Sequence, residues 1–428
     1  MEKYSCYKRE VCRVCGSVNM EEVLQLSPTP IGDAYIPKDK LRQFQQLYPV
    51  EVCLCTDCSL SQLIYVVSPE LLFVEHSIHE MSVSVGLTEH FTAYAAEVVD
   101  FIKPPADALA VDINCNDATM LGAFRNLKMR VLGTEPSTVV SQKGKENAIE
   151  ILNEFFSVEL AKKIKIEKGA ATIVVCNKFA NFDNLDGLMD SVKTLLSPDG
   201  VFVFEAVYVS DLLEKNLFEL IYHEHLNYFS VKPLKQLFKK HGMELVRAQR
   251  LPFKSGTIRG FVKFKGTPPE PCVDEMIQQE EKDQIHSPVV YEKLREMIKH
   301  IKTQLLQLLW GLKAEGKTIA AYGASVTSTT LIYNLEFAGI VDYIVDDNPK
   351  RHGLYSPGHH IPVYAPAVIY EKKPDYVVIL AWRYADTIMK HNTQFTQMGG
   401  RFILPLPEIV VTTTPIFAGG LNRTKTVE

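Results

Sequence analysis

Residues 108–136 read ALAVDINCNDATMLGAFRNLKMRVLGTEP, and this stretch decides the predicted fold. An apolar strand, ALAVDI, runs into a polar loop from Asn114 to Ala118, and a helix is expected from Thr119. A second strand, RVLGTEP, carries Glu135 at its carboxyl end. Strands that alternate with helices indicate a mainly parallel sheet with helices on its faces.

The alternation continues along the chain. ATIVVCN is a further apolar strand, and PDGVFVFEAVY follows a predicted turn at Pro198, Asp199 and Gly200. Ligands of such sheets bind outside the carboxyl ends of the strands. We therefore expect a nucleotide-like cofactor at that edge, with an α/β domain that binds no cofactor as the alternative. The candidate cofactor-binding residues are Asp112, Asn116, Asp117, Glu135, Asn177 and Glu205.

The first loop contains no glycine, although glycine usually supplies the left-handed backbone of a cofactor-binding turn. Asn114 and Asn116 tolerate the left-handed region, so the turn can form without glycine. Glu135 follows about twenty residues later, where an acidic side chain can accept hydrogen bonds from ribose hydroxyls.

Nine cysteines are present, and six of them lie within the first 58 residues. Two C-x2-C pairs, Cys12 with Cys15 and Cys55 with Cys58, can place four thiolates around one zinc ion. Such a closed shell predicts a structural site without an open position for substrate. Cys53 is a rival ligand, and a set of buried free thiols is the alternative. The spacer between the pairs must form a folded insert.

Composition narrows the class of protein. Apolar residues make up 46% and charged residues 23% of 428 residues, which suits two or three globular domains. The formal net charge is −5 and no basic tract occurs, so we expect no nucleic-acid partner. No stretch approaches the roughly 20 uninterrupted apolar residues that a membrane-spanning helix needs, so we expect no membrane partner. The polar N-terminus has no apolar core of the kind that signal peptides carry, and we expect a cytoplasmic monomer.

A second stretch carries titratable side chains between apolar residues, namely Tyr222, His223, Glu224 and His225. In a helix, Tyr222 and His225 would share one face. Histidine is the commonest general base near neutral pH, and Glu224 could hold or polarise it. In a strand, His223 and His225 could instead bind a metal, and a buried hydrogen-bonded histidine pair is the third interpretation.

The C-terminal half predicts a second, smaller α/β unit. Residues 289–313 have the apolar spacing of a long amphipathic helix. KTIAAYGAS is then a strand that turns at Gly323 into the helix TSTTLIYNL. A helix that begins after a glycine turn can bind phosphate, and a purely structural turn is the alternative.

These motifs, taken in order, resemble the SAM-dependent nucleotide-sugar C-methyltransferases of deoxysugar biosynthesis. The resemblance runs from Cys12 to about Pro407, and its most specific segment is Y-H-E-H at residues 222–225. It implies an α/β protein with a zinc-binding module (residues 1–70), a Rossmann-like methyltransferase domain (71–285), a Rossmann-like nucleotide-sugar-binding domain (286–410) and a tail (411–428). The implied ligands are Zn²⁺, S-adenosylmethionine and a dTDP-4-keto-deoxysugar.

The resemblance also implies roles for individual residues. His225, assisted by Tyr222 and Glu224, would remove the proton beside the ketone, and the enolate would take the methyl group. Residues expected to bind the sugar nucleotide are His223, Arg259, Tyr322, Gly323, Asp346 and His360. The family's cofactor loop usually reads G-S-N-D-G, where this chain has N-C-N-D-A. A catalytically inactive relative that binds a nucleotide-sugar or a protein, and a zinc-ribbon protein that binds nucleic acid, are the competing hypotheses.

Overall fold

The structure is a computed structural model that describes residues 6–75 and 86–415, so the predicted tail is seen only as far as residue 415. The chain forms two compact units. Unit 1 comprises residues 1–25, 50–214 and 223–291, and unit 2 comprises residues 26–49, 215–222 and 292–428. The residues of the predicted zinc module are thus divided between the two units.

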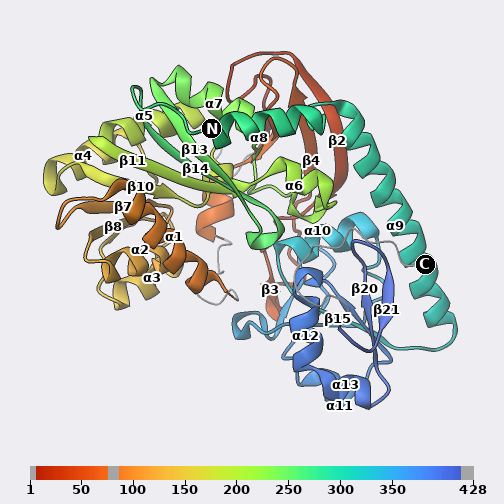
Figure 1. Cartoon of the computed structure of the whole chain (residues 1–428). Helices are drawn as coiled ribbons and strands as arrows, with labels where there is room; N and C mark the ends of the chain where they lie inside the picture. Colours follow the sequence, from red (N-terminus) through yellow and green to blue (C-terminus); the bar gives the residue numbers. More distant parts are fainter. Residues whose placement is uncertain (1–5, 76–85, 416–428) are drawn as a thin grey trace. The chain divides into compact units, whose positions relative to one another are not determined.

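Unit 1 is built around a seven-stranded sheet (Figure 1). Its strands lie in the order β13 (Met243–Leu251), β14 (Thr257–Phe264), β11 (Leu196–Val207), β10 (Ala171–Cys176), β7 (Leu109–Ile113), β8 (Arg130–Thr134) and β9 (Ile151–Leu152). The five strands from β11 to β9 are parallel, and β14 and β13 are antiparallel. The chain order reverses between β7 and β10, which is where ligands of such sheets bind.

Helices cover both faces of this sheet because successive strand residues point to opposite sides. Ile173 and Val175 pack against α1 (Leu87–Ile102) and α2 (Thr119–Asn126). Val174 and Cys176 pack on the other face, in a core with the helices α4 (Val158–Lys168), α5 (Leu185–Leu195) and α7 (Val231–Lys240). Further helices of unit 1 are α3 (Thr138–Glu146), α6 (Val209–Glu214) and α8 (Pro271–Lys282).

A smaller sheet carries the second cysteine pair. Its strands lie in the order β12 (Asn227–Tyr228), β5 (Ser61–Leu63), β4 (Tyr48–Cys55) and β2 (Met20–Thr29), and β1 (Cys6–Lys8) pairs separately with β6 (Tyr65–Val67). Strand β4 ends at Cys55, and β5 begins three residues after Cys58. The sheet therefore connects the cysteine turns to β12, which directly follows the Y-H-E-H segment.

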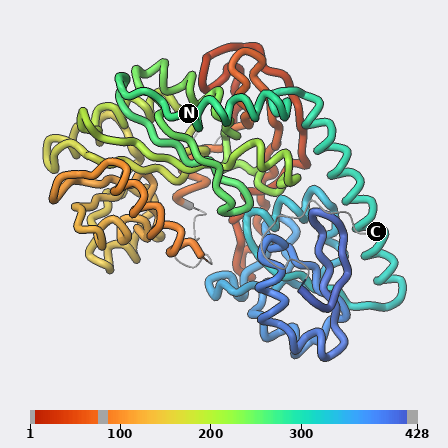
Figure 2. Tube along the Cα trace, viewed as in Figure 1, coloured from red at the N-terminus to blue at the C-terminus, as the bar shows by residue number. Residues whose placement is uncertain are grey.

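Unit 2 contains the predicted second α/β sheet. Its strands lie in the order β18 (Val363–Tyr364), β16 (Ile344–Val345), β15 (Ile319–Tyr322), β19 (Tyr376–Ile379), β20 (Arg401–Leu404) and β21 (Val410–Thr412), of which only β21 is antiparallel. Its helices are α9 (Pro288–Ala314), which begins in unit 1, and α10 (Val326–Leu335), α11 (Val368–Lys372), α12 (Ala385–His391) and α13 (Thr393–Gln397). Figure 2 traces α9 as one continuous helix, as its apolar spacing predicted.

The spacer between the cysteine pairs is folded, as predicted, but it folds as part of unit 2. The backbone N–H of Ser27 donates to Asn334 Oδ1 (2.9 Å), and Thr329 Oγ1 donates to the Gly32 carbonyl (2.9 Å). The strand β3 (Ile36–Pro37) pairs with β17 (Leu354–Tyr355). These long-range partners have no local signal in the sequence.

One predicted boundary is wrong. Residues 198–200 were expected to form a turn before a strand, but they lie inside β11, which begins at Leu196. Ala171 pairs with Leu196 and Ile173 with Val201, so a register irregularity takes up these residues within the strand.

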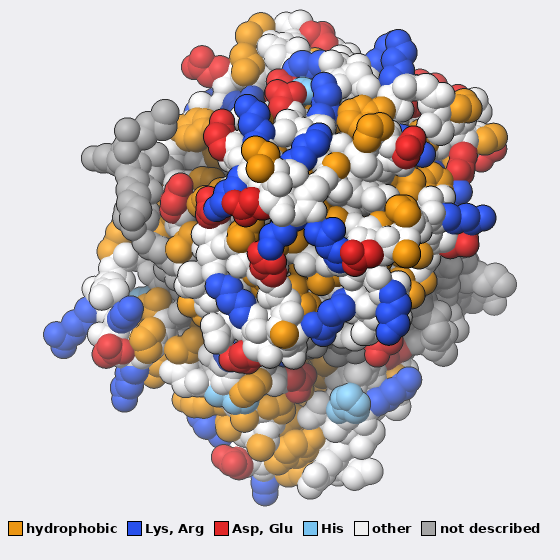
Figure 3. All heavy atoms as spheres, turned by 90° about the vertical axis from the view of Figure 1, so that its left-hand side faces the viewer, with side chains coloured by type: hydrophobic (Ala, Val, Ile, Leu, Met, Phe, Trp, Pro, Cys, Tyr) orange, Lys and Arg blue, Asp and Glu red, His pale blue; other side chains and the backbone are white. Residues whose placement is uncertain are grey.

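On the face drawn in Figure 3, basic and acidic side chains are interspersed. Among the described helices, none is long and apolar enough to cross a membrane.

Candidate functional site

Four cysteines come together in unit 1. The sulfur atoms of Cys12, Cys15, Cys55 and Cys58 lie within 4.8 Å of one another, and the closest pairs are Cys12 with Cys58 (3.4 Å) and Cys15 with Cys55 (3.5 Å). Tetrahedral zinc with Zn–S bonds of about 2.3 Å requires sulfur atoms roughly 3.8 Å apart. The sulfur spacing therefore fits one zinc ion, as the sequence predicted. No other such cluster occurs among the residues that the structure describes.

The two C-x2-C turns have the same backbone geometry. Each second cysteine is followed by a residue in the left-handed region, Gly16 (φ 74°) and Ser59 (φ 69°). The N–H of Gly16 donates to the Cys12 carbonyl (3.0 Å), and that of Ser59 donates to the Cys55 carbonyl (2.9 Å). Cys53 lies outside the cluster and pairs across the ladder with Gln62. The choice of Cys55 and Cys58 over Cys53 is confirmed.

The predicted cofactor edge lies where β7, β8, β10 and β11 end. The loop after β7 takes a left-handed backbone at Asn114 (φ 57°), Asn116 (φ 54°) and Ala118 (φ 62°). The prediction that the two asparagines replace glycine is confirmed. Ala118 adopts the same conformation, which strains a residue that carries a Cβ atom. The loop after β7 therefore makes its turn without any glycine.

Glu135 fixes this loop to the next strand. Its Oε2 accepts the N–H of Asn116 (3.0 Å), and its Oε1 accepts the N–H of Ser137 (3.1 Å). Lys178 Nζ lies 3.8 Å from Oε2. Asp117 accepts hydrogen bonds from the backbone N–H (3.2 Å) and the hydroxyl (2.6 Å) of Thr119, at the start of α2. Both acids are buried.

Three buried oxygen atoms at this edge lack a hydrogen-bond partner among the described residues: Asn114 Oδ1, Asn177 Oδ1 and Tyr94 Oη. Asn114 follows β7 and Asn177 follows β10, so they flank the point where the strand order reverses. Burial of a polar atom without a partner costs about 1–3 kcal/mol, which a ligand can recover. Burial also raises the pKa of Asp112, on β7, well above its ordinary value. These residues fit a polar ligand such as a nucleoside.

Glu205 and Arg259, predicted to contact cofactor and substrate respectively, instead contact each other within unit 1. Arg259 donates to Glu205 Oε1 through Nε (2.8 Å) and Nη2 (2.6 Å). His90 Nε2 lies 2.9 Å from Glu205 Oε2, and the His90 ring stacks on Phe253 with centroids 3.7 Å apart. The Arg259 guanidinium lies 4.0 Å from the centroid of the Tyr94 ring. Their predicted roles toward ligands remain predictions.

Reasoning from the sequence did not identify three residues near Arg259 that lie on α1, namely His90, Tyr94 and Glu97. Glu97 forms an ion pair with Arg259 Nη1 (2.5 Å). These three side chains are spaced i, i+4 and i+7, which places them on one face of the helix. A polar and aromatic stripe at that spacing is a signal that could have identified them.

The Y-H-E-H segment is neither helix nor strand. Residues 222–225 form a bend and turn between the short 3-10 helix η5 (Phe218–Leu220) and β12. The proposed helical face shared by Tyr222 and His225 is therefore wrong, and so is the strand geometry for metal binding by His223 and His225. His223 is buried, and Tyr222, Glu224 and His225 are half-buried. The boundary between the two units falls between Tyr222 and His223.

The part of this segment that belongs to unit 2 has its own anchor. Glu219 is buried and accepts a hydrogen bond from Trp382 Nε1 (3.1 Å), with Arg383 Nη1 at 3.6 Å. Burial raises the pKa of Glu219, while Arg383 opposes this effect. Residues 215–222 are thereby held to the helical turn that follows β19.

The predicted substrate residues of unit 2 lie near the carboxyl ends of β15 and β16. Asp346 accepts the N–H of Ala324 (2.6 Å) and of Asn348 (2.8 Å), and burial raises its pKa. Tyr322 donates to Asp347 Oδ1 (2.9 Å), and Gly323 has φ 107°. His360 lies in the separate loop before β18. Their contacts to a sugar nucleotide remain predictions.

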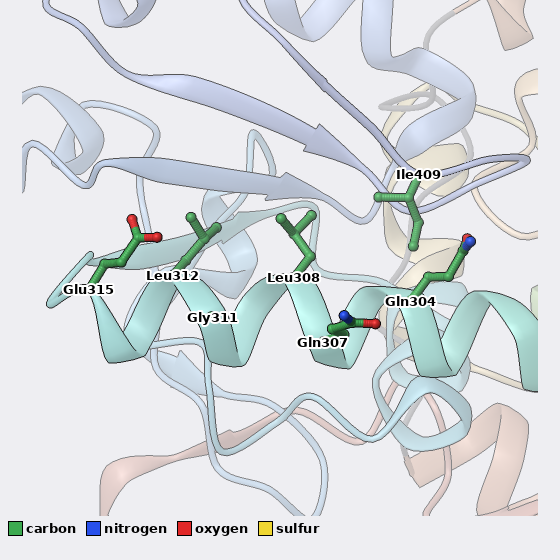
Figure 4. Close-up of a pocket in the computed structure, with 7 residues that line it drawn as sticks. All are labelled: Gln304, Gln307, Leu308, Gly311, Leu312, Glu315 and Ile409. Atoms are coloured by element: carbon green, nitrogen blue, oxygen red, sulfur yellow. The ribbon is translucent and has the colours of Figure 1, made fainter.

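A groove of about 510 Å³ also lies in unit 2, along α9 (Figure 4). It is lined by Gln304, Gln307, Leu308, Gly311, Leu312, Glu315 and Ile409. None of these residues belongs to the predicted substrate set, and only Glu315 among them is titratable. The groove therefore does not form part of the candidate site.

Comparisons with known proteins cover almost the whole chain. Three family models match: "Putative zinc binding domain" at residues 12–73, "Methyltransferase domain" at 87–248 and "C-methyltransferase C-terminal domain" at 252–407. The C-methyltransferase NovU of Streptomyces niveus is 30% identical over 404 residues, which cover 93% of this chain and 95% of that protein. The chain belongs to the C-methyltransferase family. It is a SAM-dependent C-methyltransferase.

Solved structures show more remote likeness. A SAM-dependent methyltransferase from Clostridium acetobutylicum aligns over 42% of this chain and 92% of that protein, with 8% identity and a TM-score of 0.33. The CcbJ methyltransferase from Streptomyces caelestis aligns over 42% of this chain and 90% of that protein, with 15% identity and a TM-score of 0.32. These scores are too low to identify the substrate of this C-methyltransferase.

Proposed function

We propose that this C-methyltransferase uses S-adenosylmethionine to methylate the carbon beside the ketone of a nucleotide-activated 4-keto-deoxysugar. The observation that carries the proposal is the set of unpartnered buried oxygens at the reversal point of the unit 1 sheet. Asn114 and Asn177 flank that point, and Glu135 lies at the end of the adjacent strand. This arrangement suits the adenosine part of the cofactor.

The chain's own residues then have distinct tasks. When bound, S-adenosylmethionine supplies an electrophilic methyl group. His225 takes the acidic proton at the carbon beside the ketone, and Glu224 orients the imidazole. Tyr222 donates a hydrogen bond to the enolate oxygen, where negative charge develops. The four cysteines hold a structural zinc ion that takes no part in the reaction, because four thiolates leave no open position.

Recognition of the sugar nucleotide is assigned to the remaining predicted residues. We assign Arg259 and His223, in unit 1, to the sugar nucleotide. Tyr322, Gly323, Asp346 and His360 of unit 2 are assigned to the nucleotide. The acidic formal charge of the chain favours a small-molecule substrate over nucleic acid.

The direct test combines binding and turnover with the full chain. Calorimetric titration with S-adenosylmethionine should show saturable binding, and no heat at millimolar cofactor would refute the cofactor site. Incubation with S-adenosylmethionine and dTDP-4-keto-deoxysugars should give a product heavier by one methylene group. His225→Asn should lower kcat by about 10²–10⁴-fold and leave the affinity for S-adenosylmethionine unchanged. Unchanged turnover would remove His225 from the mechanism.

A further inference from the structure

Arg13 lies inside the first cysteine turn, between Cys12 and Cys15, and it is buried. Its Nη1 donates to the carbonyl of Leu63 (2.6 Å) and to Gln62 Oε1 (3.0 Å). The same atom lies 3.5 Å from the carbonyl of Leu226. A residue of the predicted zinc site thus reaches the chain position that directly follows His225.

The contacts of Leu226 extend this connection. Its carbonyl also accepts the N–H of Leu63 (2.9 Å). The next residues form β12, in which Asn227 pairs with Gln62 and Tyr228 pairs with Ser61 of β5. Arg13 therefore binds both sides of the junction where the His225 segment joins the small sheet.

Both cysteine turns converge on this junction. The second turn leads directly into β5, and the backbone N–H of Arg13 in the first turn donates to Gln62 Oε1 (3.2 Å). The Arg13 backbone is fixed by the cysteines on either side of it. Its guanidinium, held in place by this backbone, contacts the carbonyls of Leu63 and Leu226.

A buried arginine costs free energy because its charge loses contact with water, and few acidic groups lie near Arg13 to offset this loss. Its Nε donates to Asp183 (2.9 Å), which is the one carboxylate that pairs with it among the described residues. A buried ion pair adds little stability over a well-packed apolar side chain. Its value lies in the rigid, planar guanidinium, which directs Nη1 at the oxygens of Leu63, Gln62 and Leu226 while Nε holds Asp183. Nη2 is buried and has no hydrogen-bond partner among the described residues, which adds to the cost of this side chain.

We propose that Arg13 is a positioning residue that couples the four-cysteine site to the segment after His225. The coupling holds the exit of the Y-H-E-H turn in place, so the metal site supports catalysis without contacting substrate. This inference rests on the proposed role of His225. It assigns no chemical step to Arg13 or to the metal.

The matched variants are Arg13→Gln and Arg9→Gln. Arg9 also pairs with Asp183 (3.1 Å), but its other acceptor is the Val11 carbonyl and it lies outside the cysteine turn. The structural readout is amide hydrogen exchange at Leu63, whose N–H donates to Leu226. Arg13→Gln should speed this exchange and lower kcat by about tenfold or more, with S-adenosylmethionine affinity unchanged, because a charged hydrogen-bond donor is lost. Arg9→Gln should leave both values within about twofold.

Metal removal completes the test. Treatment of the wild-type chain with EDTA should also speed exchange at Leu63, whereas the same treatment should add little in Arg13→Gln, because both changes break one connection. If EDTA speeds exchange at Leu63 as much in Arg13→Gln as in the wild-type chain, the coupling does not run through Arg13 and the inference is overturned. Unchanged exchange and kcat in Arg13→Gln would overturn it as well.

Two further outcomes are distinguishable. If Arg13→Gln fails to fold, Arg13→Lys carries the test, since lysine keeps the charge but is shorter and lacks the second nitrogen that holds Asp183. It should show the same faster exchange at Leu63 to a smaller degree, and normal exchange together with normal kcat would overturn the inference. Failure of the wild-type chain to methylate any keto sugar would refute the proposed function, and the exchange measurements would still decide the coupling.

Discussion

The two parallel sheets begin in the same way and differ at the point where ligands bind. In unit 1, Glu135 at the end of the second strand accepts the N–H of Asn116 from the first loop (3.0 Å). In unit 2, Asp346 at the end of the second strand accepts the N–H of Ala324 (2.6 Å). Both sheets reverse their strand order beside the first loop. The carboxylate that holds the loop is thus common to both units.

The reversal points themselves differ. In unit 1, Asn114 and Asn177 present buried oxygens that lack partners among the described residues. In unit 2, Gly323 lies so close to Ala381 that an added Cβ would come within 2.9 Å of its backbone nitrogen. Gly323 is therefore packed against Ala381 on one side, whereas the loop without glycine leaves a buried amide oxygen without a partner among the described residues. Glycine content alone therefore does not tell which of the two loops leaves buried polar atoms without partners.

The largest expected effect comes from Gly323→Ala. The substitution places a Cβ atom at φ 107° against the backbone of Ala381, which should destabilise unit 2 by about 3 kcal/mol. Both tryptophans of the chain, Trp310 and Trp382, lie in unit 2, so tryptophan fluorescence during urea unfolding reports this unit.

The control is Gly311→Ala in the interior of α9, where nothing lies within 4 Å of the added atom. This variant should gain up to about 1 kcal/mol from helix propensity. An equal unfolding midpoint for Gly323→Ala and Gly311→Ala would show that Gly323 does not pack tightly against Ala381.

Glu280 is another carboxylate that accepts backbone N–H groups, and it predicts a pH dependence of stability outside both loops. Glu280 accepts the N–H of Val231 (2.7 Å) at the start of α7 and the hydroxyl of Tyr208 (2.9 Å). Burial raises the pKa of Glu280 to about 7, so the folded state binds a proton that the unfolded state has released. The protonated Glu280 therefore contributes up to about 3 kcal/mol to the free energy of unfolding below about pH 4.5. This contribution is lost as the pH rises through 7.

Glu280→Gln should remove this dependence. Hydrogen exchange of the slow amides in β11 and β14 reports the stability of unit 1, and the two chains are compared at each pH. Burial lowers the pKa of the nearby His286 to about 4, which acts in the opposite direction and is present in both chains. Parallel stability curves for wild type and Glu280→Gln would contradict a titrating Glu280.

A smaller effect tests the unpartnered oxygens directly. Asn177→Leu should stabilise unit 1 by about 1 kcal/mol, because a buried amide oxygen without a partner is removed. It should also weaken S-adenosylmethionine binding by about tenfold, since the ligand loses a hydrogen bond. Calorimetry and hydrogen exchange measure the two quantities.

The matched control is Asn126→Leu at the exposed end of α2. It should leave cofactor affinity unchanged. If Asn177→Leu binds the cofactor as tightly as wild type, Asn177 does not face the ligand, and the contrast between the two reversal points is lost.

The sequence predicted what depends on local pattern. The four cysteines, the long helix α9 and the left-handed asparagines of the first loop follow from spacing and side-chain preference. The contacts of Arg13 with Leu226 and of Glu205 with Arg259 join residues far apart in the chain, and no local pattern indicates them. Local spacing left both a helix and a strand open for residues 222–225, and the structure shows neither, at a point where the chain crosses from unit 2 into unit 1.

The smallest expected effect comes from Ala118→Gly, which gives the first loop the glycine that it lacks. Ala118 has φ 62°, which costs about 1–2 kcal/mol for a residue with a Cβ atom, and glycine removes this strain. Two effects oppose this gain. Glycine has greater conformational freedom in the unfolded chain, which destabilises the folded state by about 0.5–1 kcal/mol, and the substitution removes a buried methyl group. The net gain should be about 0.5 kcal/mol, measured by hydrogen exchange in unit 1. Cofactor affinity should stay within about twofold, because Asn116 and Glu135 already hold the loop; a large increase would show that the strained loop restricts the cofactor site.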